Sequence, residues 1–212
     1  MHLEVEQSKA RLIKKSFLNL VSVEVLGVLV NSLNSMIDTV VIGRFLATDA
    51  MAAVGFFAPL LTLISLVWVI IIGLQIICGK YIGDGDKESL LAVFSTAVVF
   101  LGGLSIIASI FFYVKCDWIA SILGAQEDVA ILLQEYIKGY SFGIIGQVYC
   151  SLLMWFLAFN YDIKLSRIVV GLMVIINSAC DIFFVAILPL GIFGLGLASA
   201  MSYLGRVGKL RK

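Results

Sequence analysis

Charged residues are scarce in this sequence. Asp, Glu, Lys and Arg make up 14% of its 212 residues, whereas a soluble globular domain has roughly 25%. Hydrophobic residues make up 61%, and the mean hydropathy is +1.09. Such a chain cannot supply enough polar surface to stay in water, so we expect an all-α integral membrane protein.

Other absences exclude further classes of protein. The net charge is only +1, which argues against a nucleic-acid-binding surface. The four cysteines have no close spacing, so they predict neither a metal site nor a disulfide framework. The single histidine is His2, and no Ser/His/Asp set is present. We therefore expect no enzyme and no cofactor.

What the sequence does contain is long apolar runs, and a membrane-spanning helix needs about 20 mostly apolar residues. Five segments meet this requirement, whereas a sixth offers roughly 14 apolar residues before a basic tail. The expected segments are an N-terminal segment 1–16, spans 17–43, 52–79, 90–114, 132–158, 165–188 and 191–204, and a tail 205–212. We expect a six-helix lobe with an incomplete sixth helix, and interpret the stop as a truncation.

The distribution of basic residues predicts the orientation of this lobe. Of the 15 Lys and Arg residues, all but Arg44, Lys115 and Lys138 fall on the side that holds the N-terminus. Cytoplasmic loops carry an excess of Lys and Arg. We therefore expect a multi-pass protein of the cell membrane, in contact with membrane lipid, with both ends in the cytoplasm.

The first span carries a polar stripe. Glu24, Asn31 and Asp38 are seven residues apart, so a helix nearly superimposes them. Asn34 lies four residues before Asp38 on the same face. A carboxylate at mid-bilayer costs about 2.5–3.5 kcal/mol on insertion scales, so the stripe is expected to face an interior. Hydrogen bonds that hold helices together are an alternative explanation for the asparagines.

The fifth and sixth spans place further polar groups at a comparable depth. Asn177 and Asp181 are four residues apart, Asp38 lies six residues before Arg44, and Ser199 lies ten residues after Pro189. We therefore predict that Asp38, Asn177, Asp181 and Ser199 form a cation site. Oxygen ligands suit Na⁺, whereas two close carboxylates suit a proton, and the spacing does not choose between these ions.

Four more residues are candidates for a substrate cavity: Glu24, Asn31, Asn34 and Gln147. Each has a simpler explanation. Glu24 lies near the cytoplasmic end and can snorkel toward water, and Gln147 can be a packing polar residue. Between the spans, Asp86 or Ser89 is expected to cap the helix that follows the loop, and residues 115–131 to hold a short interfacial helix.

Several motifs, taken in order along the chain, resemble one known family. They are "SMIDTVVIGRFLATDAMAAVGFFAPL", "YIGDGDKESL", "ILGAQEDVAILLQEYIK", "FNYDIKLSR" and "INSACDIFFVAILPLGIFGLGLAS". This series resembles the multidrug and toxic compound extrusion (MATE) transporters. The resemblance implies one lobe of a twelve-helix protein that exports organic cations in exchange for Na⁺ or H⁺. It also implies that Asp38, Asn177, Asp181 and the hydroxyl of Ser199 match the family's cation site.

The sequence departs from the family pattern in three respects. Val23 and Glu24 stand where the family often has a proline, the loop between spans four and five lacks the usual Arg and Gly, and only one lobe is present. A second six-helix lobe is an expected partner. The alternatives are an inactive fragment, a helix-bundle scaffold without transport, and a lipid or polysaccharide flippase of the same superfamily.

Overall fold

The computed structural model describes the backbone of residues 2–46, 48–159 and 175–210. Within these ranges the side chains of residues 2–10, 12–13, 15–16, 19–20, 23–24, 31, 154–159 and 202–210 are outside the description. All regular structure in the described part of the chain is helical. The elements are α1 (His2–Phe45), α2 (Thr48–Asp84), α3 (Lys87–Val114), α4 (Cys116–Ile122), α5 (Glu127–Phe159), the π-helix η1 (Phe183–Ile187) and α7 (Gly191–Leu210). An apolar helix, Ile175–Ile187, ends with η1.

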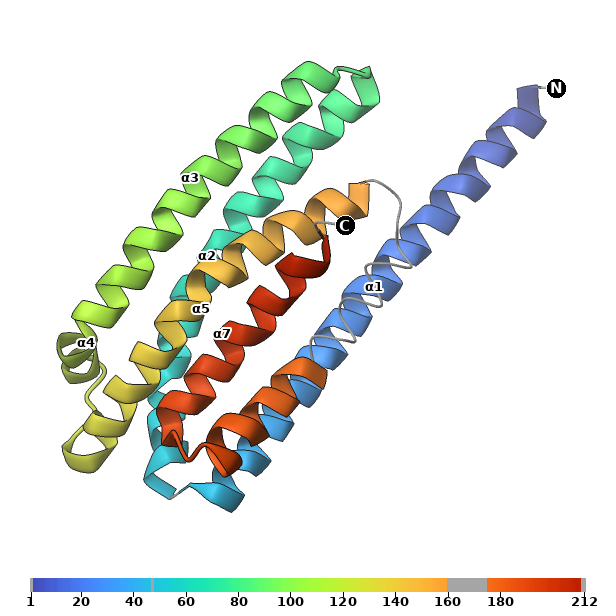
Figure 1. The fold of residues 1–212 in the computed structure, drawn as a ribbon. Helices are drawn as coiled ribbons and strands as arrows, with labels where there is room; N and C mark the ends of the chain where they lie inside the picture. Colours follow the sequence, from blue (N-terminus) through green and yellow to red (C-terminus); the bar gives the residue numbers. More distant parts are fainter. Residues whose placement is uncertain (1, 47, 160–174, 211–212) are drawn as a thin grey trace.

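The long helices form one bundle around α5 (Figure 1). α5 contacts α2, α3, α4 and α7, while α2 and α3 run antiparallel as a hairpin. α1 lies at one side of the bundle. Its N-terminal half projects away, and its C-terminal half lies beside the helix Ile175–Ile187. The start of α1 and the end of α7 lie at the same end of the bundle (Figure 1).

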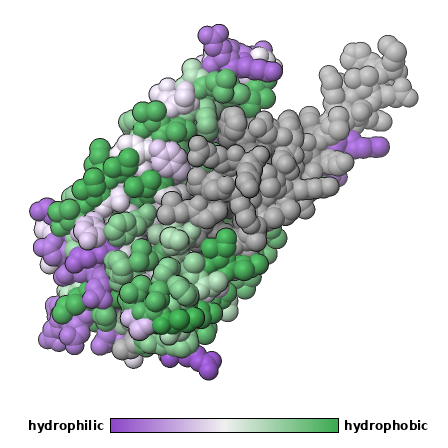
Figure 2. Space-filling view, viewed as in Figure 1, coloured by the Kyte–Doolittle hydropathy of each residue, from purple (hydrophilic) through white to green (hydrophobic). Residues whose placement is uncertain are grey.

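The surface has the banding that a membrane requires. Hydrophilic residues gather at the two ends of the bundle, and apolar residues cover the face between them (Figure 2). Among the described residues, three helices are long and apolar enough to cross a bilayer: Val25–Phe45, Thr48–Asp84 and Lys87–Val114. Ile175–Ile187 and Gly191–Met201 are shorter apolar helices.

The observed helices extend beyond the apolar spans expected from the sequence. α1 begins at His2 although the apolar run starts near residue 17, and α7 continues to Leu210 although its apolar part ends near Met201. A helix satisfies its own backbone hydrogen bonds, so it can continue from lipid into water. The first half of the span expected at 165–188 lies outside the described residues.

The turn between α2 and α3 follows from local sequence. Gly85 adopts a positive φ of 72°, and the N–H groups of Gly85 and Asp86 donate to the carbonyls of Ile82 and Tyr81. This pair of backbone hydrogen bonds ends α2. Glycine tolerates the positive φ because it has no Cβ. Asp86 then accepts a hydrogen bond from the Ser89 N–H at 3.0 Å. The predicted cap is therefore confirmed, and these bonds lower the pKa of the exposed Asp86 carboxyl.

The short helix α4 confirms the expected structure between spans three and four. It covers Cys116–Ile122, and Gly124, with a φ of 80°, ends it by the same pattern. α5 then begins at Glu127.

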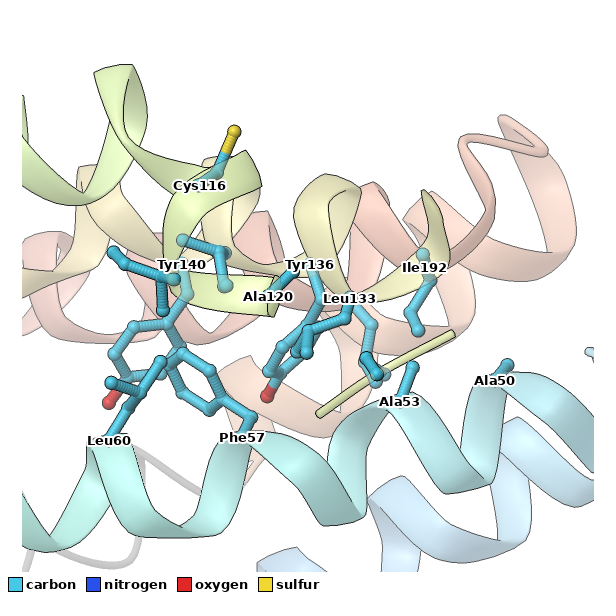
Figure 3. Close-up of a cluster of buried hydrophobic side chains, with 14 of the residues drawn as sticks. Ala50, Ala53, Phe57, Leu60, Cys116, Ala120, Leu133, Tyr136, Tyr140 and Ile192 are labelled. Atoms are coloured by element: carbon cyan, nitrogen blue, oxygen red, sulfur yellow. The ribbon is translucent and has the colours of Figure 1, made fainter. Parts of the chain in front are cut away.

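An aromatic core cluster joins α2 to α5. Phe57 of α2 is fully buried, and its ring meets Tyr136 and Tyr140 edge-on at centroid distances of 4.9 and 4.8 Å (Figure 3). Ala53 and Leu60 extend this contact along α2. Such edge-on ring pairs are favourable beyond the area that they bury.

Glycines bring α5 and α7 into close backbone contact. A Cβ on Gly196 would lie 2.7 Å from the Tyr140 backbone nitrogen, and one on Gly143 would lie 2.9 Å from the Cα of Ala200. Small residues allow membrane helices to approach in this way. The lobe is therefore held chiefly by the contacts of α5 with α7, α3 and α2, which leaves α1 as a peripheral helix.

Candidate functional site: a buried cluster of acids and amides

The candidate site lies where α1 meets the helix Ile175–Ile187. The side-chain amide of Asn34 on α1 donates a hydrogen bond to the Asn177 side-chain oxygen at 2.8 Å. Asn177 is 2% exposed, so this bond lies inside the lobe. It joins two helices through residues that are 143 positions apart in the sequence.

A pair of carboxyl groups stands one helical turn from this amide pair. Asp38 follows Asn34 by four residues, and Asp181 follows Asn177 by four residues. The Asn34 amide also lies 3.4 Å from the Asp38 Oδ2 atom. The carboxyl groups of Asp38 and Asp181 interact with each other. We name Asn34, Asp38, Asn177 and Asp181 the acid–amide cluster.

Burial gives this cluster its chemical character. Asp181 is fully buried and Asp38 is partly buried. Among the described residues, both carboxyl oxygens of Asp181, the Oδ1 atom of Asp38 and the Oδ1 atom of Asn34 have no hydrogen-bond partner. Buried polar groups are normally paired, so a gathering of unpaired oxygens needs a physical explanation.

The carboxyl and amide oxygens of the cluster suit a hard monovalent cation or a shared proton. Carboxylate and amide oxygens are the ligands that hard cations prefer. Two neighbouring carboxyl groups in a site of low dielectric constant repel each other when both are ionised, and a proton or a cation between them removes that repulsion. In the described part of the chain, no group of three or more His, Cys, Asp or Glu side chains could hold a metal ion.

A change in helix type directly follows Asp181. η1 (Phe183–Ile187) is π-helical, and the Leu188 N–H donates to the Phe183 carbonyl at 2.9 Å, five residues back. Short π-helical segments are frequent at functional sites. Here the wider turn lies between Asp181 and the Leu188–Pro189 corner that leads into α7.

The structure brings together three of the four residues predicted for the cation site. Asp38, Asn177 and Asp181 belong to the acid–amide cluster. Ser199 lies on α7 and is partly buried, and its hydroxyl donates to the Leu195 carbonyl at 3.4 Å. Its participation stays a prediction, and so does the cation-binding role of all four residues.

The candidates for a substrate cavity lie in different places. Asn34 belongs to the acid–amide cluster, where it bridges α1 and Asn177. Gln147 accepts a hydrogen bond from the Tyr140 hydroxyl at 3.0 Å, next to the aromatic core cluster. The side chains of Glu24 and Asn31 lie outside the described residues.

Ser178 was missed by sequence reasoning. Its buried hydroxyl oxygen has no partner among the described residues, and it precedes Asp181 by three positions. That spacing puts the two side chains on neighbouring parts of one helix face. The i, i+3 relation was therefore the signal that could have found it.

Comparisons with known proteins identify the fold and the family. The chain resembles the outward-facing conformation of a multidrug resistance MATE transporter of the MOP superfamily, with 22% identity and a TM-score of 0.84. It also resembles a MATE in complex with MaD3S (21%, TM-score 0.80) and a MOP superfamily transporter from Pyrococcus furiosus (21%, TM-score 0.81). Each match covers 93% of this chain and 44% of the other. A comparison with curated proteins found no match.

These likenesses confirm the expected all-helical membrane fold, and the chain spans less than half the length of the solved structures that it matches. The model of the MatE family matches residues 25–183, which is most of the chain and includes both acids of the cluster. That family comprises membrane transporters, not enzymes. The predicted resemblance is confirmed: this chain is a multi-pass membrane protein that belongs to the MATE family.

Proposed function

We propose that this lobe acts in a secondary transporter that exports organic cations in exchange for Na⁺ or H⁺, and that the acid–amide cluster binds the coupling ion. The observation that carries the proposal is the full burial of Asp181, whose carboxyl oxygens have no hydrogen-bond partner among the described residues, one helical turn from the Asn34–Asn177 bond. Ionisable groups within a membrane are expensive, and by default they mark ion or substrate pathways.

The geometry suggests how ion binding would act on the lobe. Asp38 and Asn34 lie on α1, whereas Asp181 and Asn177 lie on the helix that ends in η1. An ion between the acids removes their repulsion and favours the docked position of α1. When the site empties, repulsion acts across the same interface and favours separation. The ion thus shifts an equilibrium because its affinity differs between the two arrangements.

The substrate and the orientation complete the proposal. An organic cation is the expected cargo, with Glu24, Asn31 and Gln147 as candidate cavity residues and a second six-helix lobe as a candidate partner. The excess of Lys and Arg beside the N-terminus supports cytoplasmic ends and a cell-membrane location.

Transport by the purified chain in proteoliposomes tests this function. An imposed Na⁺ or pH gradient should drive ethidium across the membrane, and Asp38→Asn or Asp181→Asn should abolish that flux without reducing incorporation. Asp128→Asn is the matched control, because Asp128 is an exposed carboxylate in the first turn of α5. Absence of gradient-driven flux in the wild type, or flux at the wild-type level in both cluster variants, would contradict the proposal.

One observation favours a second candidate, a scaffold without transport. The Asn34–Asn177 bond joins two helices, as polar residues do when they only stabilise a bundle. On this alternative, Asp181→Asn destabilises the lobe and neither Na⁺ nor pH changes its thermal stability. On the transporter proposal, the same variant removes an ion dependence that the wild type has.

A further inference from the structure

A second feature of the lobe lies away from the acid–amide cluster. A cavity of about 440 Å³ lies among α2, α3, α4 and α5. Its floor is buried, with Leu101, Ile119 and Val148 at most 5% exposed, whereas Leu63 and Ile122 on its rim are 59% and 63% exposed. It is therefore a half-open groove with an exposed apolar rim. We name it the α3–α4 groove.

The lining of this groove selects an apolar occupant. Among the lining residues only Ser105 and Trp118 carry polar side-chain groups. The Ser105 hydroxyl is already bonded to the Gly102 carbonyl at 2.8 Å, and Trp118 lies on the rim. A polar or charged ligand would lose its water here without gaining a partner. An organic cation is thus a poor fit, and a hydrocarbon chain is a good one.

The length of the groove matches one leaflet of a bilayer. Its wall on α3 runs from Leu101 to Phe112, which at 1.5 Å per residue is about 16 Å. The hydrocarbon core of a bilayer is about 30 Å thick, so one leaflet accounts for about 15 Å. The α4 end of the groove lies near the hydrophilic end of the bundle (Figure 2). The groove therefore runs from the interface to mid-membrane, along the direction of an acyl chain.

The α4 end also offers groups that suit a lipid headgroup. Trp118 packs edge-on against Phe111 at 6.2 Å and is 54% exposed, as expected for an aromatic residue at a membrane interface. Lys115 is exposed just before α4, and Asp117 is exposed beside it. An ammonium group at this level complements the phosphate of a phospholipid.

We propose that the α3–α4 groove binds one acyl chain of a glycerophospholipid from the leaflet on the α4 side, with Lys115 directed to the headgroup phosphate. The lipid covers the buried floor residues Leu101 and Ile119, which would otherwise face a cavity. This binding is independent of the acid–amide cluster, which lies between α1 and the helix Ile175–Ile187.

Native mass spectrometry of the purified chain tests the proposal. The wild type should retain a single phospholipid adduct through detergent washing. Ala108→Phe places a ring in the groove, and Leu104→Trp fills its rim, so each variant should lose the adduct. Ile107→Phe and Ile107→Trp are matched controls, because Ile107 is 67% exposed on the same helix and does not line the groove. Both controls should keep the adduct.

Two further readouts make the result decisive. The size-exclusion elution and the helical circular dichroism of each groove variant must match those of the wild type. Leu104→Trp is the milder of the two variants, since Leu104 is 40% exposed. Lys115→Gln should reduce retention of the phospholipid. Equal adducts in groove and control variants, adducts of detergent or free fatty acid alone, or no adduct in the wild type would each overturn the proposal.

Discussion

The aromatic core cluster and the acid–amide cluster are both buried in the same lobe, yet they are built in opposite ways. In the first, Phe57 is enclosed by Tyr136 and Tyr140 from a neighbouring helix (Figure 3). In the second, Asp181 is equally buried, but both of its carboxyl oxygens lack a hydrogen-bond partner among the described residues.

The difference teaches which region stabilises the fold and which carries its chemistry. Each buried polar group without a partner costs about 1–3 kcal/mol, so the acid–amide cluster opposes folding unless an ion or a proton occupies it. The aromatic core cluster and the glycine contacts between α5 and α7 have no such cost. Stability therefore rests on the apolar contacts, and the proposed ion chemistry rests on a separate set of polar side chains in the same lobe.

The largest expected effect lies at the close contact of α5 with α7. In Gly196→Val the new side chain meets backbone atoms of Tyr140 and Tyr136 at 2.7 and 2.8 Å. Backbone cannot move aside, so we expect a loss of about 3 kcal/mol in the free energy of unfolding, measured by titration with a denaturing detergent. Gly103→Val is the control, because a Cβ there meets nothing within 4 Å. Equal stability of both variants would contradict this close packing.

Truncation in the aromatic core cluster should have the next largest effect. Phe57→Ala removes a ring that is 0% exposed, whereas Phe56→Ala removes one that is 37% exposed on the same helix. Since lipid is as apolar as the core, only the packing contribution is lost, and we expect about 2 kcal/mol for Phe57 and much less for Phe56. The same detergent titration measures both, and a larger effect at Phe56 would refute the assignment of the core.

A smaller effect is expected where α1 docks. Asn34→Leu removes the 2.8 Å bond to Asn177, and interhelical bonds in membranes contribute about 0.6 kcal/mol on average. Ser35→Leu is the control, since Ser35 is exposed on the same helix. If Asn34→Leu destabilised the lobe as much as Phe57→Ala, the contrast between the two regions would be lost. Thermal unfolding followed by circular dichroism provides the comparison.

Sequence periodicity predicted long apolar helices and the helix faces that Asn34 shares with Asp38 and Asn177 with Asp181. The four-residue spacings of Asn34 with Asp38 and of Asn177 with Asp181 are local, and a helix converts them directly into shared faces. Depth along each span then brought the two pairs to one level. This much follows from the geometry of a single helix and the thickness of a bilayer.

Other features depended on packing between helices. Spacing along α1 did not decide whether Asn34 bonds to another helix or lines a substrate cavity, because the rotation of α1 is set by its contacts with α2 and η1. The π-helical turn at Phe183–Ile187 and the α3–α4 groove were likewise unpredictable. Both arise where neighbouring helices meet, not from the spacing of residues along one helix.

Thermal stability as a function of ion concentration tests the central claim, that the acid–amide cluster binds the coupling cation. A ligand at 100 times its dissociation constant stabilises the state that binds it by about 2.7 kcal/mol. The Tm of the wild type should rise with Na⁺ if the ion is Na⁺, or with proton concentration if it is H⁺, and Asp181→Asn should remove that rise. A wild-type Tm independent of both ions, or the same dependence in Asp181→Asn, would contradict the claim.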